Sequence, residues 1–343
     1  MQTPMMDLPR GFRMTLAGVA ALVLLAMATP ALAADEEYRG WFAALDFAST
    51  QPESLDQHFA NHVDKAVTPI TGERLVIDNK TDFTYRATVG YGFGKELGSL
   101  RASYWSFDRD EKMTDTLPGG VYPTLFGLGY YPVYGVYLTN PAGVNFTATS
   151  KVKASTADLD YIRAMATGEK GSLSWLAGLR VASYEEDRGF EGTDGTRDYA
   201  QSKHLKSNGA GLRVGALANF GFTKHFSLES SAVISFMQAD TKGDATVEDV
   251  TTGGSQRREA KDNHIRGEIM DFDIKGVWSY GRADYYLGYT MSSWGGMITD
   301  PVPASAGNFV SIGSVNDRTR DTISFNSVHA GFIWRFHSRG FSP

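Results

Sequence analysis

The chain of 343 residues contains no cysteine. That absence excludes a disulfide scaffold, thiolate-bound zinc, iron–sulfur clusters and a cysteine nucleophile. Charge is sparse as well, because 21% of the residues are charged and the formal net charge is −6. A nucleic-acid binder needs a surplus of Lys and Arg for phosphate contacts, so we expect no nucleic-acid partner. The glycine-rich stretches lack the strand-to-helix context of a nucleotide-binding loop, so we expect no cofactor. We also expect no metal ion.

Long hydrophobic runs are scarce beyond the first 33 residues. Arg10 and Arg13 precede an apolar run over residues 14–27, and Ala31-Leu32-Ala33 follows it. This order is typical of a cleavable signal peptide, here residues 1–33. A membrane anchor is the alternative, but the run is short for a span and ends at small residues.

The remaining residues, 34–343, are expected to form a single exported domain. No stretch in them approaches the 18 consecutive apolar residues of a transmembrane helix. Such a chain is either soluble beyond the inner membrane or crosses a membrane as a β-barrel, since only helices and closed barrels satisfy their backbone polar groups in lipid.

Glycine and aromatic residues are abundant, and hydrophobic positions recur with a period of two. Around Phe83, Tyr85 and Ala87, apolar side chains alternate with Thr84 and Arg86. This period is that of a β-strand with one apolar and one polar face. Eight segments show it clearly, at residues 81–93, 99–107, 172–184, 209–222, 226–236, 270–280, 284–294 and 322–336, and two show it weakly, at 40–48 and 151–166.

The lengths of the connections separate a barrel from a soluble β-sandwich. Short connections at 94–98, 167–171, 223–225 and 281–283 alternate with long polar stretches at 49–80, 108–150, 185–207, 239–264 and 295–320. All short turns therefore fall at one end of the strands. A sandwich does not confine its long loops to one end, whereas transmembrane barrels have short periplasmic turns and longer extracellular loops. We predict an all-β fold, a ten-stranded antiparallel up-and-down transmembrane barrel.

Aromatic residues cluster beside the predicted short turns. In a transmembrane barrel such rings form a girdle at the headgroup level. The predicted girdle consists of Trp41, Tyr91, Phe93, Trp175, Phe220, Phe222, Phe226, Trp278, Tyr280, Tyr285, Trp334 and Phe336.

Three segments carry a resemblance to a known family. They are Asn-Gly-Ala-Gly-Leu-Arg-Val-Gly at 208–215, Asp-Phe-Asp-Ile-Lys-Gly at 271–276 and Tyr-Leu-Gly-Tyr-Thr-Met-Ser-Ser-Trp at 286–294. In this order they resemble the Legionella-type major outer membrane protein family, best over residues 150–336. The resemblance implies a pore-forming barrel in the outer membrane of a Gram-negative cell.

Charged residues on the polar face of the predicted strands are candidates for the lining of the lumen. A charge is inexpensive in a water-filled lumen and costly in lipid. The candidates are Arg86, Arg101, Arg180, Arg213, Lys275, Arg335, Asp82, Asp158, Asp160, Glu229, Asp271, Asp273 and Asp284.

The favoured function is a narrow polar channel for passive diffusion of small solutes or ions, without enzymatic activity. Outer-membrane lipids, the transported solutes and the outer-membrane assembly machinery are the expected partners, and the sequence does not define an oligomeric state. Because barrels of about eight strands are filled by side chains, ten strands lie near the closed end. A non-conducting structural or adhesin-type barrel is therefore the alternative, with the aromatic stretch 122–138 as its candidate contact loop.

A rim-site enzyme is the less favoured alternative. Its candidate pairs are His264 with Asp262, His204 with Asp198, and Asp240 with Asp244. Polar loops normally carry such residues for solvation, and none of these pairs belongs to a recognisable catalytic constellation.

Overall fold

The computed structural model describes most of the exported chain. In the described part, no helix is long and apolar enough to cross a membrane. The predicted signal peptide 1–33 and nearly all of the stretch 122–138 lie outside the described residues, which are 39–53, 58–63, 73–77, 80–94, 97–123, 138–299 and 320–336.

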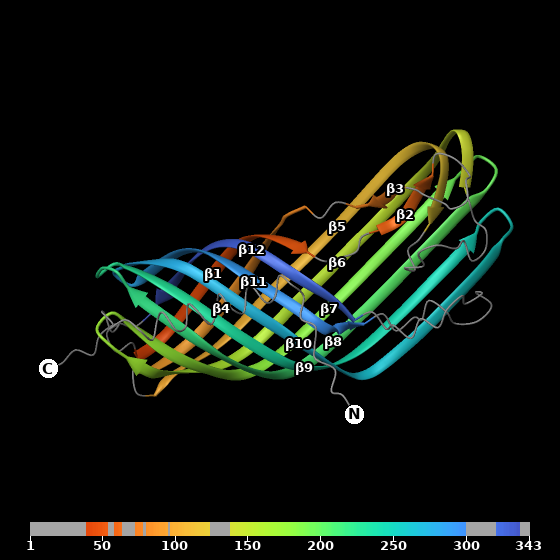
Figure 1. The fold of residues 1–343 in the computed structure, drawn as a ribbon. Coiled ribbons are helices and arrows are strands. Elements are labelled where there is room, and N and C mark those ends of the chain that lie inside the picture. The colour runs from red at the N-terminus through yellow and green to blue at the C-terminus, as the bar shows by residue number, and fades with distance from the viewer. Residues whose placement is uncertain are drawn as a thin grey trace, which may run out of the picture.

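Ten long strands close into an antiparallel barrel, as the sequence predicts (Figure 1). Each strand pairs with its neighbour in the chain, and β1 pairs with β12 to close the wall. The strands are β1 (Arg39–Glu53), β4 (Asp82–Gly94), β5 (Gly98–Pro123), β6 (Leu138–Thr167), β7 (Gly171–Thr193), β8 (Asp198–Gly221), β9 (Phe226–Asp249), β10 (Gly254–Tyr280), β11 (Ala283–Thr299) and β12 (Arg320–Arg335).

The predicted short turns all lie at one end of the barrel. They connect β4 to β5, β6 to β7, β8 to β9 and β10 to β11. The closing seam begins at the same end, where the backbone N–H of Phe336 donates to the carbonyl of Trp41 at 2.9 Å. The prediction that β1 starts and β12 finishes at the short-turn end is confirmed.

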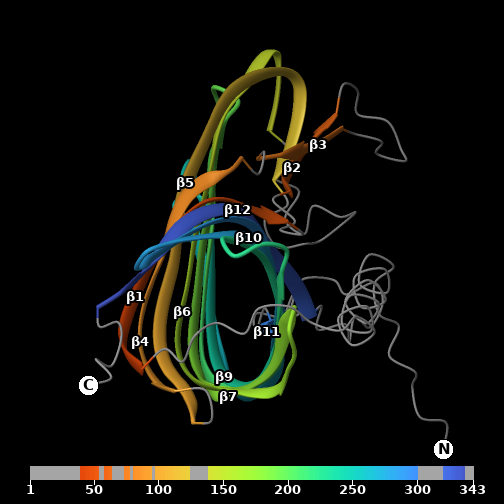
Figure 2. The ribbon, with the colours of Figure 1, turned by 90° about the vertical axis from the view of Figure 1, so that its left-hand side faces the viewer.

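The long polar stretches are not the loops that the sequence analysis predicts. Most of 108–150, 185–207 and 239–264 belongs to β5–β10, so that β6 alone has 30 residues. A strand needs about 9–11 residues to cross a membrane. The strands β5–β10 therefore continue well beyond the bilayer as one tall wall, while β1, β4, β11 and β12 form a low wall (Figure 2).

Two short strands lie in the predicted loop between β1 and β4. β2 (His58–Val63) pairs with β3 (Glu73–Val76) and with the far end of β5. The tall wall is thereby extended by a small sheet beyond the membrane (Figure 1).

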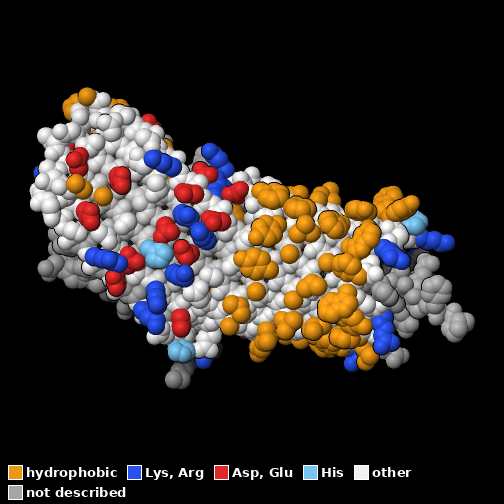
Figure 3. Space-filling model, turned by 180° about the vertical axis from the view of Figure 1, so that it is seen from behind, with side chains coloured by type: hydrophobic (Ala, Val, Ile, Leu, Met, Phe, Trp, Pro, Cys, Tyr) orange, Lys and Arg blue, Asp and Glu red, His pale blue; other side chains and the backbone are white. Residues whose placement is uncertain are grey.

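The outer surface divides into an apolar and a charged half (Figure 3). On the half near the short turns, large side chains such as Phe83, Leu212 and Leu287 are more than 60% exposed. A soluble monomer does not expose apolar area on this scale, so this band is the lipid-facing surface. The predicted girdle lies at its edge, where Trp41, Trp278 and Tyr280 are exposed.

Beyond the apolar band, the tall wall has its own hydrophobic core on the inner face. Phe146 on β6 stacks on Phe190 of β7 with ring centroids 6.0 Å apart. Val121, Leu138 and Tyr199 are buried in the same cluster. We call this part of β5–β10 with β2 and β3 the extension. We assign it to the extracellular side because all connections at the other end are short turns, which are periplasmic in such barrels.

Candidate functional site in the barrel lumen

The membrane-level lumen contains a network of charged side chains from five strands. β5, β6, β7, β8 and β10 each direct at least one charged residue inward, because side chains alternate across a strand. Three cations face three anions, so the formal charge of the network is zero. Its members are Arg101, Arg180, Arg213, Asp158, Asp160 and Asp271.

Two buried arginines connect the network. The Nε of Arg180 donates to Asp158 at 2.7 Å, and its Nη2 lies 2.7 Å from Asp271. The Nη1 of Arg213 lies 2.5 Å from Asp158 and 3.0 Å from Asp160. Arg180 and Arg213 are only 3% and 5% exposed, so the pairs are largely removed from water. Loss of one partner would leave a charge that the remaining groups cannot compensate.

A glycine opens the space that these contacts need. Gly178 on β7 lies directly between Asp160 on β6 and Arg213 on β8 in the register of the sheet. A Cβ at Gly178 would meet the side chain of Asp160 and would lie 3.0 Å from its Cα. The absence of that Cβ lets Arg213 reach across β7 to Asp160. This is a steric reason for a glycine in the middle of a strand.

A second polar cluster surrounds His329 on β12. Its Nε2 lies 2.9 Å from Asp273, and its Nδ1 lies 3.4 Å from Asp46. Lys275 pairs with Glu229 at 3.1 Å and lies 4.8 Å from the ring centroid of Tyr286.

Gly288 repeats the role of Gly178 in this second cluster. It lies between Lys275 and His329 in the register, and a Cβ there would lie 2.6 Å from the Cβ of Lys275.

Of the remaining candidates, Arg335, Asp284 and Asp82 lie nearer the ends of the lumen, whereas Arg86 lies between the two clusters. Arg335 pairs with Asp284 close to the short turns. Arg86 lines a cavity of about 30 Å³ together with Asp46 and Arg180. Asp82 is at the start of β4, where its carboxylate accepts from the N–H of Phe83 at 2.6 Å.

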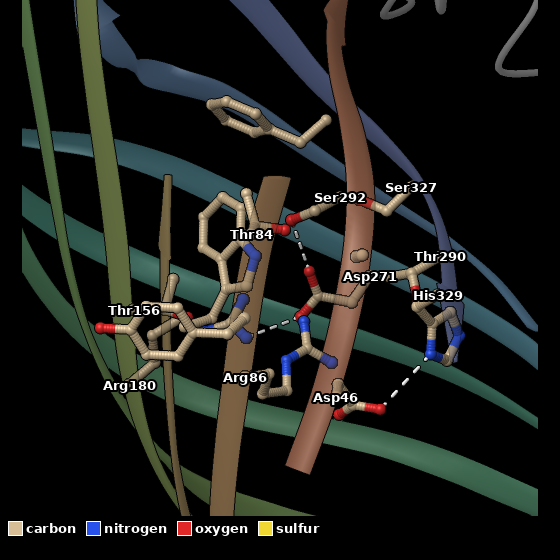
Figure 4. Close-up of a pocket in the computed structure, with 14 residues that line it drawn as sticks. Asp46, Thr84, Arg86, Thr156, Arg180, Asp271, Thr290, Ser292, Ser327 and His329 are labelled. Carbon is tan, nitrogen blue, oxygen red and sulfur yellow. Dashed lines mark hydrogen bonds and ion pairs between the residues drawn. The ribbon is translucent and has the colours of Figure 1, made fainter. Parts of the chain in front are cut away.

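The cavity between the two clusters is small. Figure 4 shows Asp46, Arg86, Asp271 and His329 pointing into the same space. A volume of about 30 Å³ holds one or two water molecules. Between the two clusters, the described side chains therefore leave room for little more than water.

An apolar cluster fills the lumen on the extension side of the charged network, and we call it the plug. Trp105, Trp294 and Phe325 pack edge to face or tilted, with centroid distances of 5.3 to 6.4 Å. The plug is linked to the network, because Trp294 donates to Ser292 at 3.0 Å and Ser292 donates to Asp271 at 2.7 Å. The other buried members include Phe107, Tyr184, Leu205, Met237, Ile269, Met297 and Ile323.

A bulge in β11 brings the Met297 carbonyl to the inner faces of β8 and β9. The register with β12 shifts between Gly295 and Ile298, and Gly296 has φ +72°. The carbonyl of Met297 accepts hydrogen bonds from Ser207 on β8 at 2.8 Å and from Thr241 on β9 at 3.3 Å. These bonds join β11 to β8 and β9, three and two strands away in the sheet, at the level of the plug.

The alternation of apolar and polar residues also assigns two further residues, His329 and Asp46, to the inner face, and the candidate set lacks both. His329 alternates with the apolar Val328 and Ala330, and Asp46 alternates with Leu45 and Phe47. The candidate set includes their partners Asp273 and Lys275 but omits both. The pairing itself has no signal in the sequence, since Asp46 and His329 are almost a full chain apart.

Among the described rim-enzyme candidates, the structure gives His204 and His264 other partners than the sequence analysis pairs them with. His204 contacts Asp187 on β7, not Asp198. The N–H of His264 donates to Asp240 at 3.0 Å. The side chain of Asp262 lies outside the described residues.

A closed ten-stranded barrel with a lipid-facing apolar band and a polar lumen defines an outer-membrane β-barrel protein. The family described as Legionella pneumophila major outer membrane protein precursor matches residues 36–268, and this chain belongs to that family. The match includes the segment 208–215 and extends into the first half of the chain, but it ends before the segments 271–276 and 286–294. Family and fold together locate the protein in the outer membrane.

Two solved structures align with most of this chain at low sequence identity. The outer membrane protease OmpT from Escherichia coli is 12% identical, with a TM-score of 0.48 and coverage of 88% of this chain and 99% of that chain. The Pseudomonas putida toluene transporter TodX is 9% identical, with a TM-score of 0.35 and coverage of 90% and 92%. No curated protein matches this chain.

Proposed function

We propose that this protein is an outer-membrane barrel closed to free diffusion, and that its extracellular extension is the surface through which it acts. One observation carries the proposal: ion-paired side chains, a buried aromatic cluster and a bulged backbone segment follow one another along the lumen. This is the structural or adhesin-type alternative of the sequence analysis, and it is preferred here to a permanently open channel.

Three layers support closure. The charged network neutralises itself across the lumen, and Arg180 and Asp160 are almost fully buried. The plug follows directly, with Trp294 and Phe325 at most 1% exposed. The Met297 carbonyl then accepts hydrogen bonds from β8 and β9 on the inner face. A hydrated ion passing through would have to break ion pairs and cross an apolar layer, which is unfavourable for a charge.

The extension supports the second half of the proposal. Its strands are much longer than a bilayer requires, and its outer face carries mixed charges on a rigid, hydrogen-bonded sheet (Figure 3). Long side chains held on paired strands form a defined surface for contacts outside the cell. The proposal assigns no catalytic step to this surface.

A gated narrow channel is the second candidate. The bulge favours it, because Gly295 and Gly296 precede the segment that closes the lumen and glycine adopts alternative backbone conformations at low cost. Displacement of Met297 from Ser207 and Thr241 would open the level of the plug toward the polar network. The small solutes or ions of the channel interpretation would then meet Arg101, Arg213 and Asp271.

Conductance measurements separate these two functions. We expect refolded protein in a planar bilayer to show no current steps, and liposomes containing it not to swell in small sugars. A general porin in the same bilayers is the positive control. Reproducible current steps whose ion preference changes with Arg213→Gln would contradict closure and favour the gated channel.

A further inference from the structure

We propose that Glu185, Asp187 and His204, on the outer face of the extension, form a binding site for a borderline divalent cation of the Zn²⁺ class. This site is separate from the lumen and goes beyond the proposed function. Its three potential ligand atoms all lie within 4.8 Å of one another.

Strand pairing holds the three side chains together. Asp187 on β7 is directly opposite His204 on β8, and Glu185 is two residues before Asp187 on the same face. The Nδ1 of His204 already contacts the Oδ1 of Asp187. Because both strands are paired on either side, the donors are positioned by the sheet and not by a mobile loop.

The chemistry of the donors indicates the class of ion. Imidazole nitrogen is a common ligand of zinc, copper and nickel, and it is a poor choice for Mg²⁺ or Ca²⁺, which prefer oxygen. One imidazole and two carboxylates supply two negative charges for a divalent ion. Three protein ligands leave a coordination position open, as in zinc sites that also bind a further ligand.

The site is open to solvent on the side of a groove. A groove of about 630 Å³ crosses the outer face of β5–β9, and Asp187 and His204 are part of its lining. The side chains of His204 and Asp187 are 37% and 45% exposed, so an ion can reach them. The groove gives space for the additional ligand of a bound ion.

Lys206 is the competitor of the ion. It is opposite Glu185 in the register, and its Nζ lies 3.2 Å from the Glu185 carboxylate. Lys206 is 46% exposed and can turn toward water. Removal of the Lys206 charge should therefore strengthen cation binding. If the three residues formed only a salt-bridge cluster, the same change would remove one of its ion pairs and would not increase affinity for a cation.

The test is titration of the refolded mature protein in detergent with ZnCl₂ by isothermal titration calorimetry. We expect one saturable site per chain that does not bind Mg²⁺. His204→Gln and Asp187→Asn should each weaken Zn²⁺ binding at least about tenfold, since even changes behind metal ligands cost 10–100-fold. Lys206→Ala should increase the affinity severalfold.

Asp108→Asn is the matched control. Asp108 pairs with Lys153 at 3.2 Å across neighbouring strands of the same outer face, without a histidine nearby on the register. Its substitution should leave Zn²⁺ binding unchanged. The proposal is overturned if no saturable binding occurs, if His204→Gln retains it, or if Lys206→Ala weakens it.

Discussion

The membrane band and the extension are built from the same strands with opposite chemistry on their two faces. On β6, Asp158 and Asp160 point inward while Leu159 faces lipid. Further along the same strand, Phe146 is buried inside and Thr147 faces outward. The register with β7 is continuous from Asn145 to Ala164, so no slip separates the two regions.

The contrast between the two regions shows how the surrounding solvent, lipid or water, determines which face of a strand is apolar. Alternation of side chains is a matter of backbone geometry and is the same in both regions. Lipid on the outside requires apolar outer residues and permits a polar lumen. Water on the outside of the extension permits polar outer residues and makes burial of Phe146 and Tyr199 favourable.

The largest predicted effect contrasts an inner with an outer ion pair. Arg180→Ala would leave Asp158 and Asp271 with too little positive charge and should lower the free energy of unfolding by about 3–5 kcal/mol. Lys153→Ala removes an exposed partner of Asp108 and should cost at most about 1 kcal/mol. Urea unfolding of the refolded protein measures both. Equal costs would mean that water screens the lumen as it does the surface.

A new arginine distinguishes the two outer faces. Ala216→Arg places a charge in the lipid-facing band of β8 and should cost about 2–4 kcal/mol near the midplane. Thr147→Arg places the same charge on the outer face of the extension and should change stability by less than about 0.5 kcal/mol. Unfolding in lipid vesicles is the measurement. A similar cost at both positions would place the membrane boundary elsewhere on these strands.

Gly178→Ala tests whether space in the lumen is limiting. The new methyl group would collide with Asp160, and overpacking of this kind should cost about 1–3 kcal/mol. Gly276→Ala is the control on the outer face, where the nearest atom to a Cβ is 3.3 Å away on the flexible ring of Phe226. The control should be close to neutral. If Gly178→Ala cost as little stability as Gly276→Ala, the lumen would be wider at this level than the structure indicates.

The smallest effect concerns the turn between β7 and β8. Asp194 accepts hydrogen bonds from the N–H groups of Thr196 and Arg197 at 2.9 and 2.8 Å. Partial burial raises the pKa of the Asp194 carboxyl, but hydrogen bonds from Thr196, Arg197 and Thr139 outweigh this and lower it below its ordinary value. Asp194→Asn should therefore cost about 0.5–1.5 kcal/mol at neutral pH.

The pH dependence of this contribution follows from its sign. A carboxyl with a lowered pKa in the folded state stabilises the fold above its unfolded pKa of about 3.9, and the contribution disappears as pH falls through the lower folded value. The difference in unfolding free energy between wild type and Asp194→Asn should decrease in strongly acidic buffer. A constant difference between neutral and acidic pH would show that charge has no part in the turn.

Much of the barrel was predictable from local pattern. The ten strands, their short turns and the lipid-facing residues follow from alternation and turn lengths, because these depend on neighbours in the chain. The strand ends at the extension were predicted wrongly. There the apolar residues Val144, Phe146 and Ala148 alternate on the inner face, but the polar outer face makes these segments look like loops.

The sequence predicted most of the charged residues that line the lumen, but not which of them form ion pairs with each other. The sequence places Arg213 and Asp160 on polar faces, but it does not say that they meet across Gly178 on a strand between them. The Met297 carbonyl, Ser207 and Thr241 carry no signal at all, since serine, threonine and a backbone carbonyl are ordinary anywhere in a barrel.

The sequence by itself determined the class of protein, because the period of two, the even strand number and the asymmetric turns are properties of consecutive residues. The tertiary structure decided which residues occupy the lumen and where the extension begins. Both depend on which side chains from distant strands meet in a confined space, and closure of the sheet, with β1 against β12, sets that space.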